Sequence, residues 1–90
     1  MKILKRSGDL EEFNPEKIKV SLENSARDIE FVLTQSDLNI ILRDVKSILN
    51  NIRKEDENTS VYELRGIVYS ILIKHNFNDI CKAFMFYKKL

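Results

Sequence analysis

Cations flank a short turn near the N-terminus of the chain. The stretch 3–18, ILKRSGDLEEFNPEKI, places Lys5 and Arg6 before a Ser-Gly-Asp turn and Lys17 shortly after it. Cations held this close together repel one another unless an anion lies between them. That anion can be internal, such as a neighbouring carboxylate, or it can be the phosphate group of a bound ligand.

Phosphate binding suits this arrangement of cations. Phosphate oxygens are best met by several cations and N–H donors that are in place before the ligand arrives. Lys17 falls on the first turn of a predicted helix, and a helix N-terminus adds positive potential. The alternative is a solvated surface in which the lysines pair with nearby carboxylates: Glu11, Glu12 or Glu16.

The acidic pair in the same stretch does not indicate catalysis. Glu11 and Glu12 are adjacent on a predicted strand, so their side chains point to opposite faces. No nucleophile with a base partner is visible in the sequence, and His75 has no second metal ligand at helical spacing. Cys81 is the only cysteine and lies on an apolar stripe. We therefore expect a protein that is not an enzyme and has no metal site of its own.

Length and composition limit the class of protein. Ninety residues are enough for one domain, 1–90, and the contents of 43% hydrophobic and 32% charged residues are ordinary for a globular chain. A net charge of +1 gives no support for a nucleic-acid partner. The apolar runs are too short for a membrane span or a signal peptide, so we expect no membrane partner and a cytoplasmic location.

The first element that must position the cations is a β-hairpin. Residues 2–6 and 10–13 are short and extended in pattern, and Gly8 supplies the permissive backbone that a tight turn needs. A two-stranded hairpin is marginal in water. A short strand near residues 57–59 is a candidate third member.

Four amphipathic helices are expected after the hairpin. The first three begin at capping residues: Asn14, Thr34 and Ser60. Thr34 and Ser60 each precede an acidic residue by three positions, which is the capping-box pattern. The first helix is expected to end near Glu30, and a break near 75–76 precedes the fourth. The sequence predicts an α+β fold, mostly α, in which a small N-terminal β-hairpin, with a candidate third strand, caps a four-helix bundle.

Gly66 lies inside the third predicted helix. Glycine in a helix interior costs roughly 1 kcal/mol relative to alanine. We therefore expect a neighbouring element to approach the backbone closely at this position.

This layout resembles the ATP-cone domain, the allosteric nucleotide-binding module of ribonucleotide reductases and of the repressor of their genes. The resemblance rests on four stretches: Ile-Leu-Lys-Arg-Ser-Gly at 3–8, Phe-Asn-Pro-Glu-Lys-Ile at 13–18, Thr-Ser at 59–60 and an approximate closing pattern at 80–88. It implies that the chain binds ATP or dATP with Mg²⁺. It also implies that the bound nucleotide controls association with a second copy or with a reductase-related protein.

The resemblance and the cation pattern together give a set of expected ligand contacts. These residues are Ile3, Lys5, Arg6, Glu11, Phe13, Asn14, Lys17, Ile18, Thr59, Lys88 and Lys89. The cations are expected to face the phosphates. Glu11 and Asn14 are expected to contact the base or the sugar. Ile3, Phe13 and Ile18 are either walls for adenine or plain core residues. The alternative function is a helical protein-interaction module that has lost nucleotide binding.

The sequence departs from the family pattern at two positions. Ser7 stands where the family commonly has aspartate, and Lys88 stands where it commonly has arginine. Lys88 keeps the charge but loses the planar fork that holds two phosphate oxygens at once. Val20, Ile40 and Phe86 lie off the apolar stripes and are the expected contacts for a protein partner.

Overall fold

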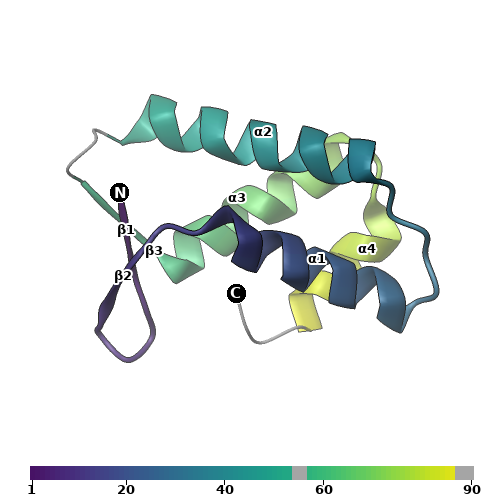
Figure 1. Ribbon diagram of the computed structural model, residues 1–90, viewed down its shortest axis with the longest axis horizontal. Helices are drawn as coiled ribbons and strands as arrows, with labels where there is room; N and C mark the ends of the chain where they lie inside the picture. Colours follow the sequence, from purple (N-terminus) through teal and green to yellow (C-terminus); the bar gives the residue numbers. More distant parts are fainter. Residues whose placement is uncertain (54–56, 87–90) are drawn as a thin grey trace.

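A small β-sheet lies at one end of a group of helices (Figure 1). The computed structural model describes residues 1–53 and 57–86. The strands are β1 (Lys2–Leu4), β2 (Leu10–Glu12) and β3 (Asn58–Ser60), and β1 lies in the middle. β1 and β2 are antiparallel, which confirms the hairpin, and β3 joins the other edge of β1 in parallel. The candidate third strand is therefore real.

The helices are α1 (Pro15–Asp28), α2 (Gln35–Ile52), α3 (Val61–Lys74) and α4 (Asn78–Phe86). α3 packs against α2 and α4, and α1 packs against α4 and α2, so the helices surround a shared core (Figure 1). The fold is α+β and mostly helical, as predicted. No helix within the described residues is long and apolar enough to cross a membrane.

The first two predicted helix caps are present. Asn14 Oδ1 accepts a hydrogen bond from the backbone N–H of Glu16 at 3.0 Å. Thr34 Oγ1 accepts from the N–H of Asp37 at 3.1 Å, and Asp37 Oδ2 accepts from the N–H of Thr34 at 3.1 Å. These bonds satisfy N–H groups that a helix start leaves without an intrahelical partner. α1 ends at Asp28, earlier than expected.

The third cap differs from the expected capping box. Ser60 Oγ accepts from the N–H of Glu63 at 3.1 Å, as predicted. The Glu63 carboxylate, however, accepts from Nη2 of Arg53 at 2.5 and 2.6 Å. Arg53 Nε also donates to the carbonyl of Asn58 at 3.3 Å. The Glu63 carboxylate therefore forms an ion pair with Arg53 and does not complete the capping box. Through its bonds to Asn58 and Glu63, Arg53 connects the end of α2 to β3 and to the first turn of α3.

The core is formed by apolar side chains from β1 and from every helix. The members with no measurable exposure are Leu22, Ile41, Val45, Val68, Leu72 and Ile80. Gly66 lies on the exposed side of α3, where an added Cβ would meet no atom within 4 Å. The expected close approach of a neighbouring element to Gly66 is therefore wrong.

Candidate functional site

The turn between β1 and β2 fixes the backbone position of Lys5 and Arg6. The N–H of Lys5 donates to the carbonyl of Asp9 at 2.8 Å, and the N–H of Gly8 donates to the carbonyl of Lys5 at 3.0 Å. Gly8 has a φ of +90°, a conformation that other residues adopt only with strain. The Ser7 hydroxyl donates to Asp9 Oδ2 at 3.0 Å. This closed turn holds Lys5 and Arg6 at the end of β1.

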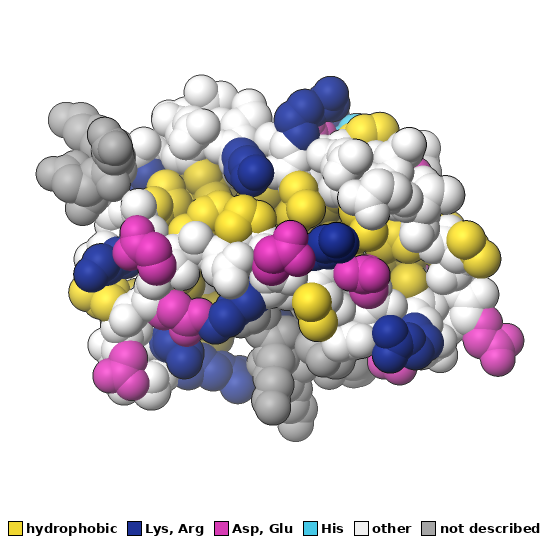
Figure 2. All heavy atoms as spheres, in the orientation of Figure 1, with side chains coloured by type: hydrophobic (Ala, Val, Ile, Leu, Met, Phe, Trp, Pro, Cys, Tyr) yellow, Lys and Arg dark blue, Asp and Glu magenta, His cyan; other side chains and the backbone are white. Residues whose placement is uncertain are grey.

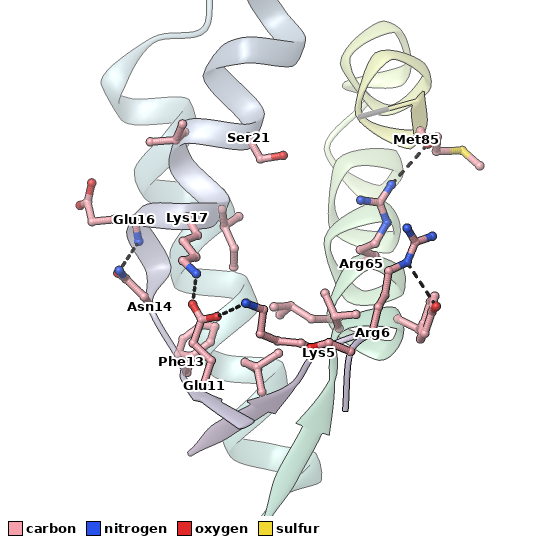
Figure 3. A pocket seen from close by; sticks show the side chains of 17 residues that line it. Lys5, Arg6, Glu11, Phe13, Asn14, Glu16, Lys17, Ser21, Arg65 and Met85 are labelled. Atoms are coloured by element: carbon pink, nitrogen blue, oxygen red, sulfur yellow. Dashed lines mark hydrogen bonds and ion pairs between the residues drawn. The ribbon is translucent and has the colours of Figure 1, made fainter. Parts of the chain in front are cut away.

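Glu11 lies between Lys5 and Lys17 (Figure 3). Glu11 Oε2 is 3.2 Å from Lys5 Nζ, and Glu11 Oε1 forms an ion pair with Lys17 Nζ. Both lysine side chains are about half exposed, so solvent screens these pairs. We call this group the Lys5–Glu11–Lys17 cluster. Figure 2 shows the corresponding mixture of basic and acidic side chains beside the hairpin, at the lower left.

A second group of cations lies on the α3 side of the same space (Figure 3). Arg6 Nε donates to the Tyr62 hydroxyl at 3.2 Å, and its guanidinium carbon is 5.7 Å from the centroid of the Tyr62 ring. Arg65 Nη2 donates to the carbonyls of Phe84 and Met85, each at 3.3 Å. The Arg65 guanidinium carbon is also 5.2 Å from the Phe84 ring centroid. Two guanidinium groups therefore face the lysines across a gap.

That gap is a cavity of about 1060 Å³ between the sheet, α1, the first turns of α3 and the end of α4. Its volume is slightly above the usual range for small-molecule sites, which is about 300–1,000 Å³. Most of the expected ligand contacts line it: Ile3, Lys5, Arg6, Glu11, Phe13, Asn14, Lys17 and Ile18. Ile3 and Ile18 are also core residues, so the two roles considered for them coexist. Val20, expected as a partner contact, lies at the cavity as well.

Of the expected contacts within the described residues, Thr59 alone does not line the cavity. Thr59 is fully buried in β3, and its hydroxyl lies 3.8 Å from Met1 Sδ as a donor. Pairing with β1 turns the Thr59 side chain inward, while the following Ser60 takes the capping role. Lys88 and Lys89 lie outside the described residues.

The sequence analysis expected contacts just before the third helix and at the end of the last helix, but it did not identify three cavity residues on α3 and α4. Tyr62, Arg65 and Met85 all line the cavity. Tyr62 and Arg65 are three positions apart near the start of α3, a spacing that puts both side chains on one face of the helix. That spacing was the available signal. It gains meaning only when α3 is known to lie opposite the hairpin turn.

Two reactive side chains lie outside the cavity lining. His75 follows α3 as its C-cap, and its Nε2 is 2.7 Å from Asp44 Oδ2 on α2. This hydrogen bond holds the pKa of Asp44 below its ordinary value. Burial raises the pKa of the Cys81 thiol and so disfavours the reactive thiolate. Within residues 1–53 and 57–86, no group of three or more His, Cys, Asp or Glu side chains could hold a metal ion.

The fold and the cavity together define a small α+β ligand-binding domain with cations on two sides of an apolar floor. The chain matches the ATP cone domain over residues 1–90 and belongs to that family. ATP-cone domains are allosteric regulatory modules that bind ATP or dATP. No curated protein sequence matches the chain.

Proposed function

We propose that this protein binds ATP or dATP in the cavity between the hairpin and α3, and that it acts as a non-catalytic regulatory module. One observation carries the proposal: Lys5, Arg6, Lys17 and Arg65 surround a single cavity of nucleotide size. The chain as a whole has a net charge of only +1, so this gathering of cations is local. A local cationic site on a nearly neutral chain favours a small polyanion as ligand.

The lining of the cavity suits the separate parts of a nucleotide. Ile3, Phe13 and Ile18 supply an apolar floor that can pack against adenine. The Glu11 carboxylate accepts hydrogen bonds and can receive them from a sugar hydroxyl or from the exocyclic amino group. Asn14 uses its side-chain oxygen to cap α1 and carries an NH₂ donor on the same amide.

Mg²⁺ is proposed to enter with the phosphates. This ion keeps several water ligands and commonly binds through substrate phosphates with few protein carboxylates. Such a site does not require a cluster of acidic side chains, and the described residues contain none. The protein's part is to hold the phosphate oxygens with its cations.

Calorimetric titration at near-physiological salt with ATP, dATP and AMP tests the proposal. Triphosphates should bind more tightly than AMP because more of the cations find phosphate partners. Equal affinity for ATP and AMP would contradict the assignment of the cations to the phosphates. No binding of any nucleotide would favour the alternative, a helical interaction module, in which Glu11 neutralises the lysines permanently.

Regulation follows from the number of elements that meet at the cavity. Residues of β1, β2, α1, α3 and α4 all line it, so one ligand contacts elements that are separate in the sequence. A ligand that binds one arrangement of these elements more tightly shifts the population toward it. We propose that the readout is association with a second copy or with a reductase-related protein, with a coupling of roughly 1–3 kcal/mol.

Light scattering with and without each nucleotide, over a range of protein concentrations, tests self-association. A mass that stays constant in every state would remove that version of the readout. The reductase-related partner would then be sought by nucleotide-dependent capture. A capture that is equally efficient with and without ATP would contradict regulation by the nucleotide.

A further inference from the structure

We infer that Arg65 is a phosphate contact that also senses the ligand, because the same guanidinium holds the C-terminal end of α4. The inference rests on the proposed binding of a nucleoside triphosphate in the cavity. It assigns to Arg65 a role that no motif in the sequence indicated. Through Arg65, a ligand in the cavity changes the hydrogen bonds at the end of α4.

Arg65 is the group that the cavity and α4 share. It lines the cavity on the α3 side, where Arg6 also lies (Figure 3). Its Nη2 donates to the carbonyls of Phe84 and Met85, which belong to the last turn of α4. These bonds join the side chain of Arg65 on α3 to the backbone of the last described turn of α4.

The bonds from Arg65 to α4 are the kind that a phosphate can replace. Both are 3.3 Å long, which is beyond the usual 2.9–3.0 Å for N–H···O bonds. Their acceptors are neutral carbonyls. A phosphate oxygen carries a negative charge, so its bond to the guanidinium gains a Coulombic attraction that a neutral carbonyl does not offer. A triphosphate within reach of Arg65 therefore draws the guanidinium away from the carbonyls.

The cavity geometry places a phosphate within the range of two arginines. Arg6 extends from the hairpin turn toward α3, where Tyr62 holds its Nε. The lysines on the opposite side already share Glu11. The guanidinium groups of Arg6 and Arg65 can each bind phosphate through two N–H groups. We place the terminal phosphates on this side and the nucleoside nearer to Glu11.

The consequence is a change at the end of α4 when the cavity fills. Loss of the Arg65 bonds removes the links from α3 to the Phe84 and Met85 carbonyls. The side chain of Met85 lines the cavity and is 58% exposed, so it reports both the ligand and the helix end. The chain contains one other methionine, Met1, which packs against the core beside Thr59.

The first test compares Arg65→Gln and Arg65→Lys with the matched control Lys74→Gln. Lys74 is an exposed cation in the last turn of the same helix and does not line the cavity. By calorimetry, Arg65→Gln should weaken ATP binding about 10- to 100-fold, the range expected for a charged hydrogen-bonded contact. AMP binding should weaken much less, and Lys74→Gln should leave both affinities unchanged.

Arg65→Lys keeps the positive charge but removes the planar guanidinium with its paired N–H donors, so it distinguishes the contribution of each. It should weaken ATP binding less than Arg65→Gln because a lysine retains one point contact. Circular dichroism establishes that each variant is folded before binding is compared. If Arg65→Gln does not fold, the inference stands on Arg65→Lys alone. A folded Arg65→Lys that binds ATP as tightly as the wild type then overturns it.

The second test uses the methyl resonances of the two methionines. ATP should shift the Met85 methyl signal of the wild type and leave the Met1 signal nearly unchanged. In Arg65→Gln, the Met85 signal should move without ligand, and its response to saturating ATP should be smaller. If Arg65→Gln binds ATP with wild-type affinity and its Met85 signal responds as in the wild type, the inference about Arg65 is overturned. The proposed function is unaffected by that result. Failure of the wild type to bind ATP would overturn the proposed function itself.

Discussion

Glu11 of β2 forms an ion pair with Lys17 on the first turn of α1. The same carboxylate lies 3.2 Å from Lys5 Nζ, so one anion serves two cations. A phosphate that approaches these lysines must compete with a carboxylate already in place. We therefore expect Glu11 to oppose binding of bare phosphate and to favour a ligand that also offers hydrogen-bond donors.

Glu11→Gln should raise the affinity for inorganic triphosphate by about tenfold because it removes a negative charge from the cavity and leaves Lys5 and Lys17 without their carboxylate partner. The affinity for ATP should rise less, since the glutamine accepts donors from the nucleoside less strongly. Calorimetry with the two ligands measures the change. Glu12→Gln is the control, because the Glu12 side chain is 73% exposed and does not line the cavity. An unchanged ratio of affinities in Glu11→Gln would contradict this selectivity role.

Lys5→Ala and Lys17→Ala should each weaken ATP binding by about 1.5–3 kcal/mol. The melting temperature without ligand should change little, because exposed ion pairs contribute about 0–1 kcal/mol to stability. Lys46→Ala, an exposed cation on α2, is the control for loss of charge alone. Thermal melts are measured together with the titrations. A large loss of stability with unchanged ATP affinity would show that the lysine has a structural role instead.

Gly66→Ala should stabilise the protein by roughly 0.5–1 kcal/mol, since glycine is unfavourable in a helix interior. The added methyl group would meet no atom within 4 Å. Chemical denaturation gives the change in the free energy of unfolding. A destabilised variant would mean that the backbone at Gly66 needs a conformation that alanine resists. Stabilisation accompanied by loss of nucleotide-dependent association would instead place a partner at this face of α3.

The Asp44–His75 hydrogen bond should make stability depend on acid pH. It lowers the pKa of Asp44 from its ordinary 3.8, with smaller contributions from the charges of Lys74 and Arg43. The unfolded state therefore takes up the proton at a higher pH than the folded state does. The stabilisation is present above pH 3.8 and is lost as the pH falls through the lower, folded pKa.

Asp44→Asn should therefore flatten the decline of the unfolding free energy below about pH 4. Urea denaturation at a series of pH values measures this slope. Asp28→Asn, which removes an exposed carboxylate at the end of α1, is the control. A slope that is the same in Asp44→Asn and in the wild type would show that this hydrogen bond contributes nothing to acid stability.

Features set by neighbouring residues could be predicted from the sequence. Asn14 and Thr34 cap helices through atoms two or three positions away, so the local pattern contains the whole interaction. Glu63 shows where local patterns fail to predict an interaction. The pattern predicted that Glu63 completes a capping box, but its carboxylate instead bonds to Arg53. Gly66 had a visible local cost, but its surroundings depend on packing that no short stretch encodes.

The part of the candidate site that comes from the N-terminal stretch was predictable, including Arg6, which lies on the α3 side of the cavity. Lys5, Glu11 and Lys17 lie within one short stretch, and all three reach the cavity. Arg65 becomes a cavity residue because α3 packs opposite the hairpin, a relationship between distant parts of the chain. Thr59 is buried because β3 pairs with β1 in a register that pattern alone does not specify.

The parallel pairing of β1 with β3 has a consequence for how the protein is made. Lys2 pairs with Asn58, so the sheet closes only after α1 and α2 have been synthesised. Contacts between such distant segments cost loop-closure entropy and slow folding. A nascent chain emerges N-terminus first, and its opening hairpin must wait on the ribosome for β3 and α3. The cavity therefore forms late, after the residues of α4 that line it have been synthesised.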